Sequence, residues 1–398
     1  MSTTISEDKP KETKETVRVG NAEISKILDS ISHKIDSKTK INLVCYVYDP
    51  MCISHVPLPV TDSDGVTRPH QESKHRVQKI NGALHVTGLS SIFITGGSIE
   101  MKRADLHRVH TPEYIKQIEN LCKLNRPGKL DPPSTETSIS GFKSLESIYA
   151  AAASVMGGIN MICADRPIST AILKESYAKQ NKTKPIYRSN VPRRVFCNVR
   201  PPGHHAHTNR GAGFCFLNNV AIGAKYAQVR YPHIKKILIV DWDLHHGDGT
   251  QDVFKNDANI LYISLHRGTD FYPGTGSDTD NELYPNILNV PLKANTTIEE
   301  YMAHFNGEVM QKAYTFKPDL IIISAGFDSH KDDTYHELPL DYKDYSYMTR
   351  CIIDLAETYA QGRIVSVLEG GYNINVLIGS VVSHVATMID YDGVVRLE

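Results

Sequence analysis

One short polar segment carries several residues that could do chemistry. The apolar run 236–240 leads directly into Asp243 and His245, which are two residues apart and so point to the same side of an extended chain. Asp328 follows a second apolar run. Each signal alone also fits a capped turn, but together they supply one histidine and two carboxylates. This set predicts a catalytic zinc site with coordination left open for water and substrate.

A pair of adjacent histidines follows a third apolar run. His204 and His205 each have two ring nitrogens that need partners if the rings are buried. Asp241 and Asp248 are two further carboxylates near the proposed ligands, and a carboxylate bound to one imidazole nitrogen raises the basicity of the other. Two His–Asp pairs beside an activated water would provide acid–base groups for hydrolysis. The alternative is a structural polar network.

These polar segments follow buried strands of one predicted sheet. The apolar runs are continuous and rich in β-branched residues, as is typical of strands buried on both faces, and helical patterns such as 297–314 and 342–360 alternate with them. We therefore predict an α/β fold, a single domain of three layers with a mainly parallel central sheet and helices on both faces. Ligands bind beyond the carboxyl ends of such strands. The predicted strands are 41–48, 91–95, 194–199, 236–243, 260–266, 319–328 and 363–370.

Three further segments lie outside this alternation of strands and helices. Residues 1–17 are mostly polar and predict a disordered tail, which leaves 18–398 as one domain. Apolar residues at three- and four-residue steps predict a helix over 21–36 that packs on the body, with partner docking as the alternative. The polar segment 164–192 contains three prolines and predicts a surface insertion.

The composition excludes several classes of protein. The 398 residues include 44 basic and 45 acidic side chains, and this balance argues against a dedicated nucleic-acid binder. A hydrophobic content of 40% excludes disorder over most of the chain. No apolar run reaches the roughly 18 residues of a membrane span. The seven cysteines form no CxxC pair and no apolar leader precedes them, which predicts reduced thiols in an intracellular protein.

Six motifs in a fixed order carry a resemblance that covers about residues 41–390. The sequence resembles the zinc-dependent histone deacetylase family, which shares its fold with arginase. The first motif, Trp242 and the ending Gly-Thr-Gln of the third motif are similar to the class II branch, whereas Asp248 stands where that branch usually has Asn. The motifs are RPPGHHA (200–206), GFCFLNN (213–219), DWDLHHGDGTQ (241–251), FYPGTG (271–276), SAGFDSH (324–330) and LEGGYN (368–373).

The resemblance implies removal of an acetyl or related acyl group from lysine in histone or non-histone proteins, by a catalytic domain over 18–398. It also implies Zn²⁺ as the catalytic cofactor and K⁺ as a structural ion. The implied residues are the zinc ligands Asp243, His245 and Asp328; the general base and acid His205 with its electrostatic partner His204; Asp241 and Asp248, which orient the two histidines; the carbonyl donor Tyr372; the tunnel residues Gly213, Phe214 and Tyr272 with Ser138 and Tyr335 at the rim; and the potassium site Asp241, Asp243 and Ser264.

Three other functions fit parts of the pattern. A binuclear manganese ureohydrolase of the same fold needs a carboxylate at position 247, which is Gly247 here. An acetylpolyamine deacetylase tends to carry an acid at the rim position that Tyr335 occupies. A scaffold-type homologue carries His in place of the intact Tyr372. The expected partners are acetylated proteins and corepressor-type proteins, with no direct nucleic acid and no membrane, in the nucleus or the cytoplasm.

Overall fold

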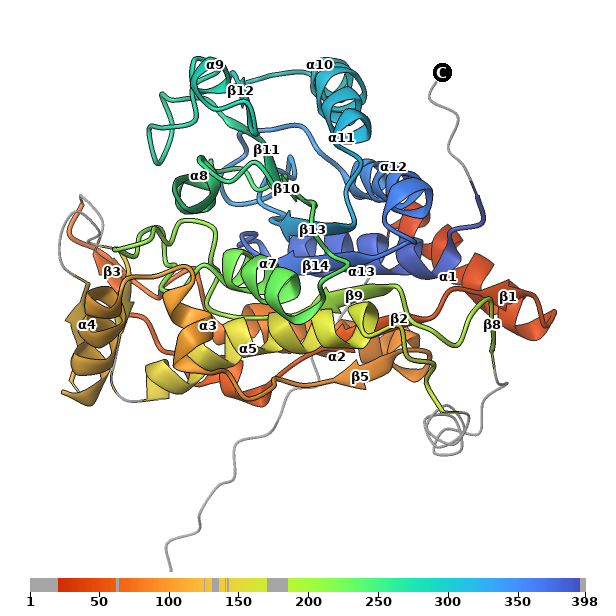
Figure 1. The fold of residues 1–398 in the computed structure, drawn as a ribbon, viewed down its shortest axis with the longest axis horizontal. Helices are drawn as coiled ribbons and strands as arrows, with labels where there is room; N and C mark the ends of the chain where they lie inside the picture. Colours follow the sequence, from red (N-terminus) through yellow and green to blue (C-terminus); the bar gives the residue numbers. More distant parts are fainter. Residues whose placement is uncertain are drawn as a thin grey trace, which may run out of the picture.

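The computed structural model describes residues 21–61, 64–124, 126–130, 136–139, 141, 143–169 and 185–393. At its centre is an eight-stranded sheet in the order β12-β11-β10-β13-β14-β9-β2-β5, in which all neighbouring strands are parallel. Helices surround this sheet (Figure 1), which confirms the predicted fold class. The strands are β2 (Val44–Val47), β5 (Ile94–Gly96), β9 (Arg194–Cys197), β10 (Ile237–Asp241), β11 (Ile260–Arg267), β12 (Ile287–Leu292), β13 (Leu320–Ala325) and β14 (Ile364–Leu368).

Successive residues of β9 face different helices. The Phe196 ring contacts His384 of α13 (Ile374–Asp390), with 6.0 Å between ring centroids. Its neighbour Cys197 lies against Gly158 of α5 (Lys143–Cys163), where an added Cβ would come within 2.8 Å of the sulfur. Because successive strand residues point to opposite faces, α5 and α13 cover opposite faces of the sheet. α7 (Asn219–Arg230) packs beside α5, and α1 (Ala22–Asp36), α2 (Lys74–Val86) and α12 (Tyr342–Tyr359) pack on α13.

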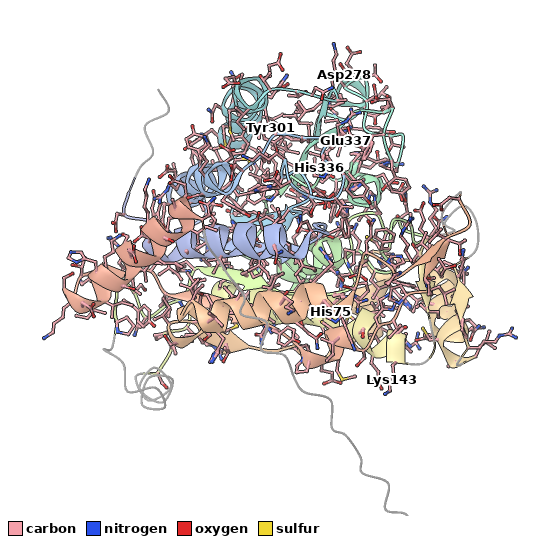
Figure 2. All side chains as sticks on the ribbon, turned by 180° about the vertical axis from the view of Figure 1, so that it is seen from behind. His75, Lys143, Asp278, Tyr301, His336 and Glu337 are labelled. Atoms are coloured by element: carbon pink, nitrogen blue, oxygen red, sulfur yellow. The ribbon has the colours of Figure 1, made fainter. Side chains whose placement is uncertain are left out.

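Helix α5 is buried although it is long and apolar. By length and composition its 21 residues could cross a membrane, but 72% of its most apolar window is buried inside the molecule. It packs between α7 and strands β2 and β9, and side chains fill the space between the layers (Figure 2). These contacts explain the hydropathy of α5 as that of a core helix.

The predicted helix over 21–36 forms as α1, and it packs on the body. The Asn21 side chain accepts a hydrogen bond from the amide of Glu23 and caps the helix. Ile24 and Ile31 are buried, and α1 packs on α13. The predicted tail 1–17 lies outside the described residues.

Part of the predicted insertion 164–192 belongs to the ordered body. Residues 170–184 lie outside the described residues, but β8 (Ile186–Tyr187) pairs in parallel with β1 (Lys40–Ile41). The hydroxyl of Tyr187 also donates to the carbonyl of Ile92. The end of this segment is therefore tied to the fold through a separate two-stranded sheet, while most of its described residues are exposed or half-buried, and its interpretation as a surface insertion stays a prediction.

The sequence pattern missed one strand of the central sheet and several two-residue strands outside it, and it predicted one continuous helix where the structure has an interruption. The edge strand β12 contains Pro291, which interrupts a strand pattern and is tolerated at an edge because no inward amide is lost. The predicted helix 297–314 is divided by a π-helical turn at Phe305–Val309. The remaining elements are α3 (Arg103–His107), α4 (Pro112–Lys123), α8 (Asp248–Phe254), α9 (Asp280–Leu283), α10 (Ile298–His304), α11 (Met310–Phe316), the 3₁₀ turns Pro50–Ile53 and Leu89–Ser91, and the short strands β3 (Val60–Thr61), β4 (Thr67–Arg68), β6 (Gly128–Lys129) and β7 (Ser138–Ile139).

The buried His384 should make stability depend on pH. Its ring nitrogens lie 2.6 Å from the Thr349 hydroxyl and 2.8 Å from the Ser366 hydroxyl, and burial lowers its pKa to about 3. The ring is neutral in the fold but titrates near 6.5 when unfolded, so stability is complete above that pH and is lost as the pH falls toward 3. Between pH 7 and pH 5 we expect the free energy of unfolding to fall by about 1–2 kcal/mol less in His384→Gln than in the wild type.

Urea unfolding at several pH values measures the slope of the free energy of unfolding against pH. His33→Gln, a substitution at an exposed histidine of α1, is the matched control and should retain the slope of the wild type. If His384→Gln has the same slope as the wild type, the claim that His384 is buried as a neutral ring is wrong.

Candidate active site

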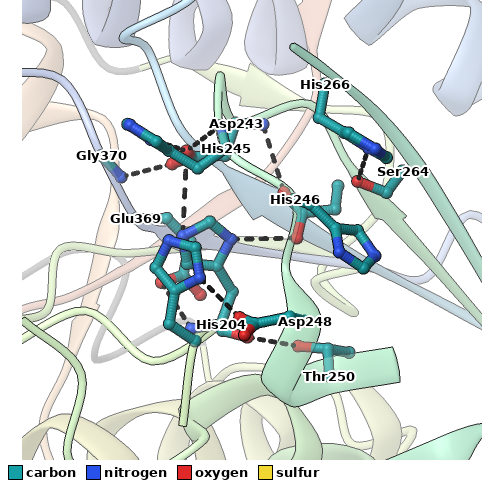
Figure 3. A network of polar contacts seen from close by, with 12 residues as sticks. His204, Asp243, His245, His246, Asp248, Thr250, Ser264, His266, Glu369 and Gly370 are labelled. Atoms are coloured by element: carbon teal, nitrogen blue, oxygen red, sulfur yellow. Dashed lines mark hydrogen bonds and ion pairs between the residues drawn. The ribbon is translucent and has the colours of Figure 1, made fainter. Parts of the chain in front are cut away.

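The carboxyl ends of four neighbouring strands meet at one edge of the sheet. β10, β13, β14 and β9 are adjacent and parallel, so the segments that follow them converge. These segments carry Asp243, Asp328, Glu369 and His204 in turn. Figure 3 shows the resulting polar network, which is almost entirely closed to solvent.

Asp243, His245 and Asp328 come together as the sequence predicts. One ligand atom from each lies within 4.8 Å of the others, and the Nδ1 atom of His245 is 3.0 Å from Asp243 and 3.2 Å from Asp328. Amide groups fix both carboxylates: Gly370 donates to Asp243 at 2.8 Å, and Leu244 donates to Asp328 at 2.9 Å. The second oxygen of Asp328 has no hydrogen-bond partner among the described residues.

The charges of this group favour a bound cation. Burial, with the negative charge of Asp243 as the next cause, raises the pKa of Asp328 to about 6. Two carboxylates this close in a dry site repel one another unless a positive charge lies between them. One imidazole and two carboxylates are also the nitrogen and oxygen donors that zinc accepts. The three side chains therefore fit a single divalent metal ion.

His204 and His205 stand in unlike electrostatic surroundings. Their ring centroids are 4.0 Å apart; His204 pairs with Asp241 at 3.2 Å and His205 with Asp248 at 2.7 Å. Burial lowers the pKa of His204, but the charges of Asp243 and Asp241 outweigh it and hold that pKa well above its usual value. Burial and the neighbouring His204 lower the pKa of His205 to about 4. The pair therefore combines a cationic ring with a neutral one.

Glu369 connects the two histidines to the end of β14. One of its carboxylate oxygens accepts hydrogen bonds from the amides of Gly203 and His204, at 2.7 and 3.2 Å. Burial raises the pKa of Glu369 to about 7. This side chain was not among the predicted site residues, although it belongs to the quoted motif 368–373, and its contact joins segments 165 residues apart.

Tyr372 is held beside the metal-binding group by both its backbone and its ring. Its amide donates to Asp333 at 2.8 Å, the Arg76 guanidinium lies 5.0 Å from its ring centroid, and Phe214 contacts the ring edge at 6.0 Å. Burial holds the pKa of the phenol well above its usual value. The hydroxyl therefore stays protonated and can donate a hydrogen bond.

A cavity of about 540 Å³ opens onto this group. Its lining includes His205, His245 and Tyr372, together with the aromatic side chains Phe214, Tyr272 and Tyr335. The cavity also has an acidic and a basic side chain, Glu136 and Arg68. Its aromatic lining suits an apolar group, and its few polar side chains suit a polar end.

Gly213 allows the cavity wall to approach His205. An added Cβ at this residue would lie 2.2 Å from the His205 ring, and its φ is +48°. The next residue, Phe214, also has a positive φ of 69°, which turns its ring toward the cavity. Any larger side chain at position 213 would therefore displace the His205 ring or the cavity wall.

The two predicted rim residues have different positions. Tyr335 lines the cavity, its ring lies 5.1 Å from that of His245, and Gln71 donates to its hydroxyl. Ser138 is not among the lining residues: it is buried in β7, and its hydroxyl accepts a hydrogen bond from the amide of Leu58 at 2.8 Å. The structure therefore contradicts Ser138 as a rim residue, because that hydroxyl supports a loop instead.

The predicted potassium residues lie together at the end of β10. Asp241 and Ser264 are opposite each other in the pairing of β10 with β11. The Asp241 carboxylate already accepts hydrogen bonds from the Asp243 amide and the Tyr262 hydroxyl, and Ser264 lies 2.9 Å from His266. Both side chains therefore already have hydrogen-bond partners within the protein.

Comparisons with known proteins agree with this geometry. The model of the histone deacetylase domain family matches residues 70–388. The chain is 33% identical over 383 residues to type-2 histone deacetylase 2 of Dictyostelium discoideum. The matched region covers 89% of this chain and 21% of that protein. It is 32% identical over 364 residues to histone deacetylase clr3 of Schizosaccharomyces pombe, with 87% of this chain and 48% of that protein covered. The chain thus spans less than half the length of these two relatives.

Solved structures show the same fold. The crystal structure of the HDA15 HD domain superposes with a TM-score of 0.71 at 28% identity and covers 86% of this chain and 90% of that domain. An acetylpolyamine aminohydrolase from Burkholderia pseudomallei superposes with a TM-score of 0.70 at 21% identity and covers 87% and 98% of the two chains. The second similarity concerns the fold alone.

Replacing one predicted ligand should weaken metal binding. We expect Asp328→Asn to reduce the zinc content of the purified protein from about one ion per chain toward zero, because an amide cannot supply the negative charge. Elemental analysis and competition with a chelator measure this. Asp332→Asn, at an exposed carboxylate four residues away, is the control and should keep its zinc. Full zinc occupancy in Asp328→Asn would show that this carboxylate is not a ligand.

Proposed function

Because the chain belongs to the histone deacetylase family, and so is a hydrolase of acetylated substrates, we propose that it is a zinc-dependent lysine deacetylase. It would hydrolyse the acetyl, or a related acyl, amide on lysine of histone or non-histone proteins. The observation that supports this best is that the metal-binding group, the neutral His205 and the Tyr372 phenol all border one cavity. The two relatives extend well beyond the region that this chain matches. The partners given below are therefore part of the proposal.

Asp243, His245 and Asp328 would hold the zinc ion. When bound, zinc would act as a Lewis acid toward the amide carbonyl and toward water. His205 would take the proton of the attacking water on Nε2, since Asp248 holds its Nδ1 at 2.7 Å. It would then deliver that proton to the departing lysine amine, and no other proton carrier is needed.

His204 and Tyr372 would stabilise charge around this proton transfer. The cationic His204, paired with Asp241, disfavours a second positive charge on His205 and so keeps that base neutral until it receives the proton. The Tyr372 hydroxyl would donate a hydrogen bond to the carbonyl oxygen as negative charge develops there. Phe214 and Tyr272 would enclose the lysine stem.

One further ion, a location and candidate partners complete the proposal. A potassium ion would lie at the end of β10, bound by Asp241, Asp243 and Ser264 partly through their carbonyls. The protein would act in the nucleus or the cytoplasm. Corepressor-type proteins are candidate partners there.

One observation favours a second substrate class. Glu136 lines the cavity, and a carboxylate at that position would attract an acetylated polyamine, whose remaining amines are cationic. Arg68 lines the same cavity and Tyr335 occupies the rim, so the lining offers no clear excess of negative charge. A scaffold with little activity would not need the protonated Tyr372.

A substrate panel tests the proposed function. Zinc-loaded protein is assayed for kcat/KM on acyl-lysine peptides of increasing chain length, on acetylated histone peptides and on acetylpolyamines. We expect hydrolysis of acetyl-lysine peptides to exceed that of polyamines. The reverse order would support the polyamine alternative, and inactivity toward all substrates would support a scaffold.

Removal of the phenolic hydroxyl should reduce turnover without loss of metal. We expect Tyr372→Phe to lower kcat by about 10²–10³-fold, because one donor to the developing oxyanion is lost. Zinc content and melting temperature should stay at wild-type values. Tyr284→Phe, which removes the hydroxyl of a partly buried tyrosine that does not line the cavity, is the matched control and should keep wild-type turnover. Equal turnover of Tyr372→Phe and wild type would remove the phenol from the mechanism.

Tyr335 should influence which substrates enter. Its ring borders His245 and its hydroxyl is held by Gln71, so Tyr335→Leu widens the cavity without removing a ligand. We expect the ratio of kcat/KM between bulky and small peptides to change by an amount that corresponds to at most about 1–3 kcal/mol of activation free energy. Tyr335→Glu should favour acetylpolyamines by adding an acid. Gln71→Leu, which only frees the phenol, should give a smaller change of the same kind as Tyr335→Leu; identical substrate rankings in all variants would contradict a role for Tyr335.

A further inference from the structure

Asp248 is shared by two histidines, only one of which the proposed mechanism uses. One carboxylate oxygen lies 2.7 Å from Nδ1 of His205, and the other lies 2.8 Å from Nε2 of His207. Asp248 and His207 are both buried. The family resemblance assigned no role to His207, and His207 does not line the cavity.

Helix α8 holds the His207 ring from two sides. Asp248 and Asp252 are one helical turn apart, so their carboxylates lie on the same face of the helix. Asp248 faces Nε2 of His207 at 2.8 Å, and Asp252 faces Nδ1 at 3.5 Å. The loop rests closely on the helix, because a Cβ at Gly249 would lie 2.4 Å from the Ala206 carbonyl oxygen. The loop that carries His207 therefore lies directly against the helix that carries Asp248 and Asp252.

The backbone of His207 is fixed as well. Its amide donates to the carbonyl of Arg210 at 2.9 Å, and its own carbonyl lies 2.9 Å from Nδ1 of His110. Ring and backbone thus have defined partners on three separate elements. Such a rigid support is what a residue needs if it is to orient another side chain.

The charges around His207 favour a protonated ring. Burial lowers its pKa, but the hydrogen bonds with Asp248 and Asp252 outweigh it and raise the pKa above its usual value. The remaining charges are Arg210, whose guanidinium lies 2.8 Å from Nε2, and Lys255, which pairs with Asp252 at 3.1 Å. Arg210 is exposed and can turn toward water, whereas the buried Asp248 has no such freedom and needs a donor at Nε2.

We propose that His207 is a positioning residue of the deacetylation reaction, which holds Asp248 in the orientation that fixes the ring of His205. With both carboxylate oxygens occupied, Asp248 cannot rotate, and it keeps the proton of His205 on Nδ1. The Nε2 atom of His205 is then left unprotonated toward the cavity, as a general base requires. This inference rests on the proposed function for its catalytic consequence, but its hydrogen bond can be tested without any substrate.

Steady-state kinetics of two substitutions separate positioning from a purely structural effect. His207→Leu removes the donor, and we expect kcat to fall by about 10- to 100-fold while KM stays within about twofold, because His207 does not touch the cavity. His207→Gln carries an amide nitrogen near the place of Nε2 and should recover most of kcat. Arg210→Gln alters the exposed neighbour of the same ring and should stay within about twofold of the wild type.

The protonation of His207 is read separately by ¹⁵N NMR of labelled histidine in the zinc-loaded protein. We expect an imidazolium at pH 7 in the wild type and a neutral ring in Asp248→Asn. A neutral His207 with its proton on Nδ1 in the wild type would overturn the inference. So would a folded His207→Leu with wild-type kcat, or a His207→Gln as impaired as His207→Leu.

These outcomes are distinct from a failure of the proposed function. Inactivity of the wild type toward every acyl substrate would refute the deacetylase proposal, and the NMR experiment would still decide whether His207 donates to Asp248. If His207→Leu does not fold, the kinetics of His207→Gln and the NMR spectrum remain decisive.

Discussion

The structure depends on the burial of two like charges at one point. Asp243 and Asp328 follow adjacent strands, both are excluded from solvent, and both lie within about 3 Å of the same imidazole nitrogen. Without a cation such an arrangement costs free energy, because each carboxylate loses hydration and repels the other. The fold tolerates it because amide donors from two neighbouring segments orient the oxygens. A divalent ion turns this unfavourable group into a stable one.

The same constraint organises the polar groups further out. The carboxylate charges raise the pKa of His204, the charge of His204 lowers the pKa of His205, and Asp248 then fixes the neutral ring by one hydrogen bond. Charge therefore alternates outward from the proposed metal site: burial and the adjacent His204 lower the pKa of His205, whereas the charges of Asp243 and Asp241 outweigh burial and raise the pKa of His204. His207 extends this alternation to the surface of α8.

Much of this arrangement could be predicted from sequence because it is local. Continuous apolar runs predict buried parallel strands, and polar residues directly after them must meet at the same sheet edge, which is why Asp243 and Asp328 could be placed together. Contacts between distant loops have no such signal. The bond between Gln71 and Tyr335 spans 264 residues, and it depends on loop conformations that periodicity does not describe. The expected rim role of Ser138 failed for the same reason, since alignment to a motif gives a position but not a side-chain direction.

The account is tested most directly by X-ray diffraction from crystals of the zinc-loaded protein, with data collected on both sides of the zinc absorption edge. The account predicts one strong anomalous peak per chain, about 2.0–2.2 Å from ligand atoms of Asp243, His245 and Asp328. A protein that binds zinc but shows its peak elsewhere, or no peak between these three side chains, would contradict the central claim that they form the metal site.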